Sequence, residues 1–284
     1  MALMRRFSAY RCANPRCHRH VSALRQWLFR PRSYALNGSP YCSENCLRPQ
    51  LQSVLNHFIF RGNLSAGPLH RSTIGLILLD FNLITLPQLN EVLARQRDGD
   101  RRFFGEIVIS LGFISEKQIT LALSRQEGLP WLDLDRRRVD PAALQKVPPE
   151  LAFCSLIMPL DFDLGLAELN VVAAAPVDRM ALTALQQMNR CRVNCFIGPE
   201  SKVKQLLAEN YGQESASRRL ERKSVPKPED VYALREELMY QYRIASGVGM
   251  EVAPYHKSLW MRIHTPMGTR DFFYSISSEE EAPA

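Results

Sequence analysis

The sequence lacks any apolar run long enough to cross a membrane. Its longest apolar stretches, such as residues 76–79 and 171–175, fall far short of the roughly 20 residues that a spanning helix needs. The first residues, MALMRRFSAYRC, hold arginines but no apolar segment behind them, which argues against a secretory signal. We therefore expect a cytoplasmic protein without a membrane span. A mitochondrial transit peptide is the alternative interpretation of this arginine-rich start.

The common catalytic signatures are also missing. The chain contains no G-x-x-x-x-G-K-[ST] loop to cradle nucleotide phosphates, and no H-E-x-x-H or G-x-S-x-G run. We therefore expect a protein that is not an enzyme. With 284 residues, 46% of them hydrophobic, the chain is long enough for two small folded domains with appendages.

Lysine and acidic residues are nearly absent from the first 72 positions. This segment holds eleven arginines, no lysine and a single acid, Glu44, so its formal charge is +10, whereas the whole chain carries +7. Such a segment attracts polyanions, and nucleic acid, anionic lipid and an acidic protein face are the candidate partners. A simpler explanation is that the arginines only keep the segment soluble.

Four of the seven cysteines form two close pairs near the N-terminus, Cys12-x4-Cys17 and Cys42-x3-Cys46. Two such pairs separated by a loop can place four thiolates around one structural zinc ion. His18 and His20 are substitute ligands, and a set of free buried thiols is the alternative. The sequence thus predicts a basic, zinc-binding segment over residues 1–62.

A tandem repeat with a period of 30 residues follows this segment. The first copy, RSTIGLILLDFNLITLPQLNEVLARQ, begins at Arg71, and the second, RRFFGEIVISLGFISEKQITLALSRQ, begins at Arg101. Eight of the 26 aligned positions are identical, and seven of the others are apolar in both copies. The two copies are therefore expected to fold alike.

Each copy is expected to form a short helix, a turn and a longer helix. Asn82 and Gly112 occupy equivalent turn positions, and both residue types tolerate the left-handed conformation that ends a helix. Thr85 and Ser115 then precede a glutamine by three residues, which is the capping-box pattern of a helix start. Two such hairpins predict a small four-helix domain.

A mixed pattern follows the repeat. Strand-like runs at 155–163, 168–174 and 192–197 alternate with helical runs at 178–188 and 201–211. This alternation predicts a compact domain in which helices cover a sheet.

The C-terminal part begins after a polar stretch and is expected to form a helix at 229–245 and strands at 258–264 and 270–276. The fold class is therefore α+β. The predicted parts are a zinc knuckle segment at 1–62, a repeat domain at 70–140, a small α/β sandwich-like domain at 141–212, a linker at 213–228, a helix and β-hairpin at 229–276, and a disordered acidic tail at 277–284.

Residues 71–212 resemble the N-terminal module of type II secretion and type IV pilus assembly ATPases, the MshE/GspE N-terminal or MshEN-like module. The family pattern is two 24-residue motifs, R-L-G-x-x-L-x-x-x-G-x-x-x-x-x-x-L-x-x-x-L-x-x-Q. Here they correspond to 73–96 and 103–126, with six residues between them. The resemblance implies that both motifs together bind one cyclic di-GMP, with apolar side chains against the guanines and glycine amides near the phosphates.

The resemblance also assigns candidate ligand-binding residues by position: Ile74, Gly75, Leu83, Leu89, Leu93 and Gln96 in the first copy, and Phe104, Gly105, Phe113, Ile119, Leu123 and Gln126 in the second. Three arginines just upstream of the motifs are further candidates: Arg71, Arg101 and Arg102. Thr73 and Phe103 stand where the motif has its leading arginine, and the chain's own arginines lie one or two residues upstream. Arginine matters because its fork pairs with two phosphate or base acceptors at once.

These patterns predict a non-catalytic regulatory or adaptor protein, linked to secretion, pilus or other second-messenger-controlled systems. Two alternatives stay open. The repeat can be a degenerate scaffold that serves only protein contacts, or the chain can be a zinc-dependent nucleic-acid binder that uses its arginine-rich segment.

Overall fold

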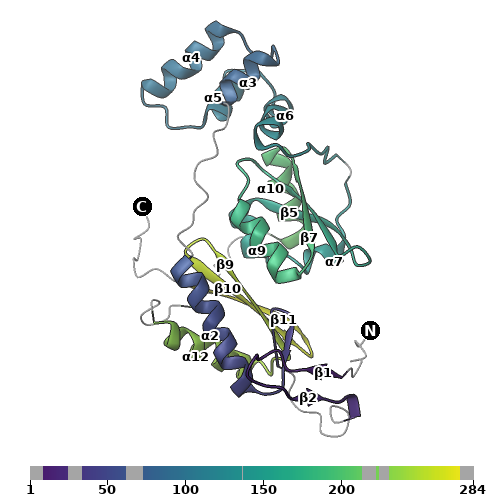
Figure 1. The fold of residues 1–284 in the computed structure, drawn as a ribbon. Helices are drawn as coiled ribbons and strands as arrows, with labels where there is room; N and C mark the ends of the chain where they lie inside the picture. The colour runs from purple at the N-terminus through teal and green to yellow at the C-terminus, as the bar shows by residue number, and fades with distance from the viewer. Residues whose placement is uncertain are drawn as a thin grey trace. The chain divides into compact units, whose positions relative to one another are not determined.

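The computed structural model describes residues 9–24, 34–61, 73–135, 137–212, 222–223 and 230–275. The chain divides into two compact units: unit 1 comprises Met1–Ser65, Gln187–Asn189 and Arg219–Ala284, and unit 2 comprises Ala66–Gln186 and Arg190–Arg218 (Figure 1). Among the described residues, no helix is both long and apolar enough to span a membrane. The predicted acidic tail at 277–284 lies outside the described residues.

The repeat in unit 2 forms four helices, α3 (Ile74–Asp80), α4 (Leu86–Arg97), α5 (Phe104–Ser110) and α6 (Glu116–Glu127). The turns between the paired helices take the predicted backbone conformation, with φ of 54° at Asn82 and 71° at Gly112. The side chains of Thr85 and Ser115 cap α4 and α6 through complete capping boxes. Local sequence signals therefore set where these helices begin and end.

Apolar side chains from both copies share one core. Leu78 of α3, Val92 of α4, Ile107 of α5 and Ala122 of α6 are fully buried in it. α3 packs against α5 and α6, and α4 packs against α5. Each hairpin buries its apolar face against the other copy, so neither copy forms a complete hydrophobic core by itself.

The second half of unit 2 is a three-stranded sheet with helices packed on it. The strands are β5 (Ile157–Asp163), β6 (Glu168–Ala173) and β7 (Arg192–Ile197) in the order β5-β6-β7, with β5 antiparallel and β7 parallel to β6. The helices are α7 (Pro141–Leu144), α8 (Pro149–Ser155), α9 (Arg179–Asn189) and α10 (Glu200–Tyr211). Helices α7, α8 and α10 contact the sheet directly, so the mixed helix and sheet character that the sequence indicated is present.

Unit 1 is built from both ends of the chain. Its N-terminal elements are β1 (Tyr10–Arg11), β2 (His20–Val21), β3 (Tyr34–Leu36), β4 (Ser39–Tyr41) and α2 (Glu44–Arg61). Its C-terminal elements are β8 (Arg222–Lys223), α12 (Val231–Ile244), β9 (Gly249–Tyr255), β10 (Ser258–Thr265) and β11 (Gly268–Ser275). Strands from both ends form one six-stranded sheet in the order β4-β3-β9-β10-β11-β8, whereas β1 and β2 pair with each other.

This arrangement corrects the predicted domain boundaries. The segments 1–62 and 229–276 were expected to be separate, but β3 pairs with β9 and their side chains share one core. The predicted linker also contributes β8, which pairs with β11. Strand β9 was not predicted, because Gly249 and Pro254 weaken its strand pattern.

Candidate functional site

A pocket of about 380 Å³ lies in unit 2 where the repeat meets the sheet domain. Its repeat-derived lining is mainly apolar and combines Ile74 from the first copy with Phe104, Gly105, Ile119 and Leu123 from the second. Residues from both copies thus meet at one concave surface, which is the geometry that a ligand bridging the two motifs needs.

The two copies contribute unequally to this pocket. Of the predicted ligand-binding residues in the second copy, five line it: Phe104, Gly105, Ile119, Leu123 and Gln126. Among the described residues of the first copy that were predicted to bind the ligand, only Ile74 does so. Repeat symmetry is therefore broken at the pocket, where α6 of the second copy packs against β7 of the sheet domain.

The other predicted residues have structural positions outside the lining. Leu89 is buried in the repeat core, while Leu83 and Phe113 pack against it. A Cβ atom added to Gly75 would lie 2.7 Å from Leu89 Cδ1 and 3.4 Å from the Phe104 ring, so this glycine allows close helix packing. For Gly75 the structure therefore supports a packing role.

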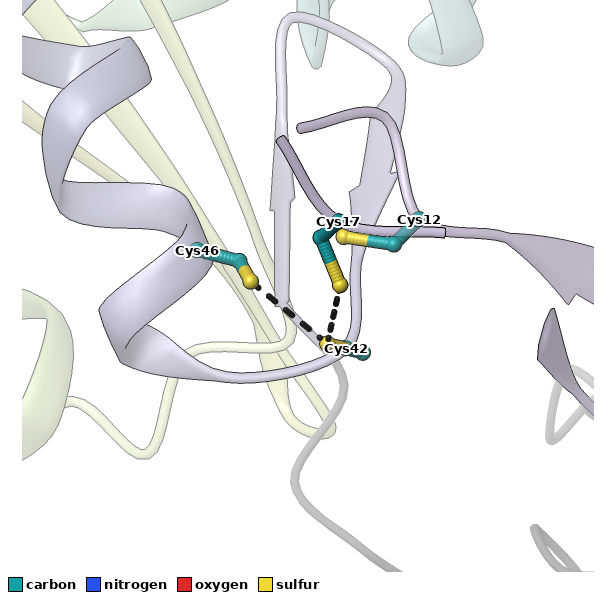
Figure 2. A group of neighbouring side chains, drawn as sticks. All are labelled: Cys12, Cys17, Cys42 and Cys46. Carbon is teal, nitrogen blue, oxygen red and sulfur yellow. Dashed lines mark hydrogen bonds between the residues drawn. The ribbon is translucent and has the colours of Figure 1, made fainter. Parts of the chain in front are cut away.

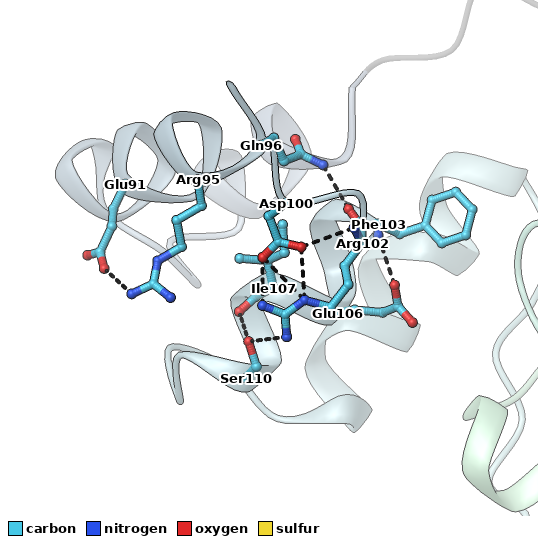
Figure 3. Close-up of polar contacts among 9 residues, drawn as sticks. All are labelled: Glu91, Arg95, Gln96, Asp100, Arg102, Phe103, Glu106, Ile107 and Ser110. Carbon is cyan, nitrogen blue, oxygen red and sulfur yellow. Dashed lines mark hydrogen bonds and ion pairs between the residues drawn. The ribbon is translucent and has the colours of Figure 1, made fainter. Parts of the chain in front are cut away.

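The arginines of the second copy lie outside the lining as well. Figure 3 shows Arg102 turned toward Asp100 and Ser110, and its guanidinium lies 2.6 Å from the Asp100 carboxylate. This ion pair lowers the pKa of Asp100 to about 2. Gln96 donates a hydrogen bond to the Arg102 carbonyl at 3.1 Å, so Gln96 orders the loop between the copies. Arg101 is exposed, and Arg71 lies outside the described residues.

Phe103, at the second motif-arginine position, lines the pocket with three-quarters of its side chain exposed. Its ring points away from the Asp100–Arg102 pair (Figure 3). The backbone amide of Phe103 donates to Glu106 at 2.8 Å, which satisfies one of the amides at the start of α5. A large apolar ring therefore occupies the mouth of the pocket where the motif would place a cation.

Four carboxylates line the pocket, those of Glu106, Glu116, Glu127 and Glu200, and the residues that line it include no lysine or arginine. Glu127 is almost completely buried and pairs with Arg179 at 3.1 Å. Glu116 accepts hydrogen bonds from the backbone amide and hydroxyl of Ser201. The lining therefore offers acceptors rather than cations to a ligand.

The sheet domain supplies pocket residues that the repeat could not indicate: Ala175, Pro176, Gly198 and Glu200. Ala175 and Pro176 follow β6, and Gly198 follows β7, so the ends of two neighbouring parallel strands face the pocket. Ligands commonly bind beyond the carboxyl ends of parallel strands. The predicted strands at 168–174 and 192–197, and not a motif, were therefore the signal that could have indicated these residues.

The four N-terminal cysteines form a second candidate site, in unit 1. Figure 2 shows their sulfur atoms directed toward one another, and all four lie within 4.8 Å of each other. The Cys42 sulfur is 3.7 Å from that of Cys17 and 3.6 Å from that of Cys46. A tetrahedral zinc site with bonds of about 2.3 Å requires sulfur atoms roughly 3.8 Å apart. The spacing fits such a site, and all four cysteines are free thiols.

Hydrogen bonds fix the loop that carries the first pair of cysteines. The buried Asn14 side chain donates to the Cys46 carbonyl and accepts from the Arg16 amide, and the Cys17 amide donates to the Asn14 carbonyl. Within the described part of the chain, the potential metal ligands that cluster here are the four cysteines alone. His20 is exposed, and His18 lies 3.4 Å from Arg11 instead.

The thiols differ in acidity because their surroundings differ. A hydrogen bond with the backbone of Arg19 lowers the pKa of Cys17 to about 7. Burial, together with the neighbouring thiols, raises the pKa of Cys42 to about 12. Four thiolates at this spacing repel one another, so a bound dication would offset their charge.

Comparison with known families identifies the part of the chain that follows the repeat. Residues 127–217 match the MshEN domain family. These residues are an MshEN domain. The match begins directly after Gln126, the last residue of the second repeat motif, so the pocket is formed between the repeat and the MshEN domain.

Similar proteins carry this region within longer chains. The type IV pilus assembly ATPase PilB of Myxococcus xanthus is 25% identical over 144 residues, which is 51% of this chain and 25% of that protein. Bacteriophage adsorption protein B of Escherichia coli K12 is 30% identical over 112 residues, which is 39% of this chain and 14% of that protein. The chain thus spans a quarter or less of the length of these relatives.

Solved structures are also similar to part of this chain. A structure of MshE with cdg shares 29% sequence identity and a TM-score of 0.43, covering 50% of this chain and all of that one. The N-terminal domain of XpsE shares 18% identity and a TM-score of 0.37, covering 47% of this chain and 90% of that one.

Proposed function

We propose that this chain is a non-catalytic regulatory or adaptor protein, and that its repeat and MshEN domain together bind cyclic di-GMP. The observation that carries this proposal is the pocket at the second repeat motif, which also takes in Ile74 from the first. A bridging ligand would connect the two copies to the MshEN domain and restrict their relative movement. Such a ligand would shift the module toward one conformation, which is how a messenger alters a partner surface.

The lining suits the bases of the ligand better than its phosphates. Phe104, Ile119 and Leu123 offer apolar surface for a purine ring. The carboxylates of Glu106 and Glu116 can accept hydrogen bonds from the amino group of guanine. Because no cation is among the lining residues, we expect affinity to be ten- to about a hundredfold weaker than with the motif arginines.

Two equivalent leucines provide a matched test of this proposal. Leu123 lines the pocket, whereas Leu93, its counterpart 30 residues earlier, lies outside the lining and is 38% exposed. In calorimetric titrations of the full chain, Leu123→Asp is expected to weaken cyclic di-GMP binding at least about tenfold. Leu93→Asp should leave the affinity within a factor of about two.

The same titration distinguishes a cyclic di-GMP receptor from a module that serves only protein contacts. An equal loss of affinity in both variants would place the ligand elsewhere and contradict the proposed pocket. An absence of heat from the wild-type chain at about 100 µM ligand would remove the receptor function. The second candidate, a module used only for protein contacts, would then stand, because the carboxylate-lined pocket lacks a cation for an anionic ligand.

We propose in addition that Cys12, Cys17, Cys42 and Cys46 hold one structural zinc ion. The support is their mutual sulfur spacing, which fits tetrahedral thiolate coordination. Elemental analysis of the purified chain should give one zinc per molecule. Cys42→Ser should lose it, and Cys191→Ser, which alters a half-buried thiol outside the cluster, should keep it. Retention of zinc by Cys42→Ser would refute the assignment.

A reduced thiolate site also favours a cytoplasmic location.

Contact with nucleic acid through the arginine-rich segment is the remaining candidate. Arg11, Arg16 and Arg19 are exposed near the cysteine cluster, whereas Arg48 is engaged by Glu44 and Glu236. Binding of this kind would weaken steeply with salt and require residues 1–62. Affinity for DNA or RNA that does not change with salt would exclude it.

A further inference from the structure

The cysteine cluster lies where the two ends of the chain join. Cys42 directly follows β4, and Cys46 lies in the first turn of α2. Cys17, Cys42 and Cys46 pack against the same core that contains residues of α12 and of the C-terminal strands. The cluster is therefore part of the core of unit 1 and not a separate knuckle beside it.

Backbone pairing extends this connection into the C-terminal sheet. Leu36 of β3 pairs with Met250 of β9, and the Asn37 amide donates to the Met250 carbonyl at 2.9 Å. The Asn37 side-chain oxygen accepts from the Val252 amide, also at 2.9 Å. The β3–β4 hairpin that leads into Cys42 is thus the edge of the sheet to which β9 belongs.

Helix α2 provides a second connection to the C-terminal half. Leu47, Leu51 and Leu55 of α2 are fully buried in the core that also holds Leu234 and Leu238 of α12. In addition, the Arg48 guanidinium donates to both oxygens of Glu236, at 2.7 and 2.8 Å. The helix that begins at the cysteine cluster therefore covers the C-terminal elements.

We infer that metal binding at the cysteine cluster controls the folding of the C-terminal sheet, more than 200 residues away in the sequence. This inference rests on the proposed zinc site. Strands β3 and β4 have only three residues each, which is too short for an isolated hairpin to be stable. Where a site forms only in the folded state, metal binding contributes directly to folding. The metal thus fixes β3, β4 and the start of α2, and these elements complete the sheet and core.

Hydrogen exchange on the full chain tests this inference. The protein is compared with its bound metal and after treatment with a zinc chelator. Amides of β9 and β10 are expected to lose protection by at least about a hundredfold on chelation. Amides of β5 and β6, which belong to unit 2, serve as the internal control and should not change. Readdition of zinc should restore protection in β9 and β10.

Two results would overturn the inference, and only one of them would also contradict the proposed zinc site. If zinc leaves the protein but β9 and β10 keep their protection, the coupling is wrong while the zinc site stands. If the purified chain neither contains nor binds zinc, the site and the coupling both fail. Cys46→His adds an independent check, because imidazole is also a zinc ligand and should preserve protection, whereas Cys46→Ser should lose it.

Discussion

The two motif glycines should respond differently to the same substitution. A Cβ atom at Gly75 would lie 2.7 Å from Leu89 Cδ1, whereas one at Gly105 would lie 3.3 Å from Ile119 Cγ1. The first distance is well inside van der Waals contact, and Leu89 is itself buried between the helices. We therefore expect Gly75→Ala to destabilise the repeat by about 1–3 kcal/mol through overpacking.

Gly105→Ala should cost less, because a shift of a few tenths of an ångström relieves its contact. Replacing glycine within a helix by alanine also contributes about 0.5–1 kcal/mol of stabilisation, which offsets much of that cost. Both glycines lie at the second position of their helices, α3 and α5, so the backbone context is matched.

Hydrogen exchange of α3 to α6 in the full chain measures both effects without requiring the whole protein to unfold in one step. Faster exchange in Gly75→Ala, with little change in Gly105→Ala, is the expected result. Equal responses would refute the reasoning, since they would mean that the close approach of Leu89 to Gly75 does not limit packing. A chain in which Gly75→Ala lost only ligand affinity would refute it as well.

Two further predictions concern the same region. Thr85→Ala removes the side-chain cap of α4 and should lower the stability of the repeat by about 1 kcal/mol, measured as faster hydrogen exchange in α4; an unchanged rate would contradict the capping role. The carboxyl group of Asp100 should titrate near pH 2 in an NMR experiment, because Arg102 favours its charged form. Any stabilisation from this ion pair is present above the ordinary pKa of the carboxyl group and is lost as pH falls through its lowered pKa. Arg102→Ala should return the pKa of Asp100 toward its ordinary value of 3.8, and an unchanged midpoint would exclude the pairing.

Features that depend on neighbouring residues could be predicted from the sequence. The turns at Asn82 and Gly112 and the caps at Thr85 and Ser115 follow from residue types within a few positions of each other. The gathering of the N-terminal cysteines was also predictable, since two close pairs require only one loop to bring them together. In the turns and caps the signal and the structure are both local, and within each cysteine pair the spacing is short.

Features that depend on distant pairing could not be predicted. Nothing near Leu36 indicates that it pairs with Met250, so the two ends of the chain looked like separate segments. The pocket also depends on contacts between distant parts of the chain that the sequence does not indicate. Leu93 and Leu123 are equivalent in the repeat, but only Leu123 lies at the pocket that Pro176 and Gly198 of the MshEN domain help to form. A motif identifies equivalent positions without showing which of them lies beside another domain.

The arginine missing from the motif offers the most direct test of the central claim. Phe103→Arg places a cation at the pocket mouth, on a side chain that is already largely exposed. Leu76→Arg adds the same charge at an exposed position outside the pocket lining and serves as the control. Titration with cyclic di-GMP should show Phe103→Arg binding about tenfold more tightly than the wild type, with Leu76→Arg unchanged. If neither the wild type nor Phe103→Arg binds, the pocket is not a cyclic di-GMP site and the account is wrong.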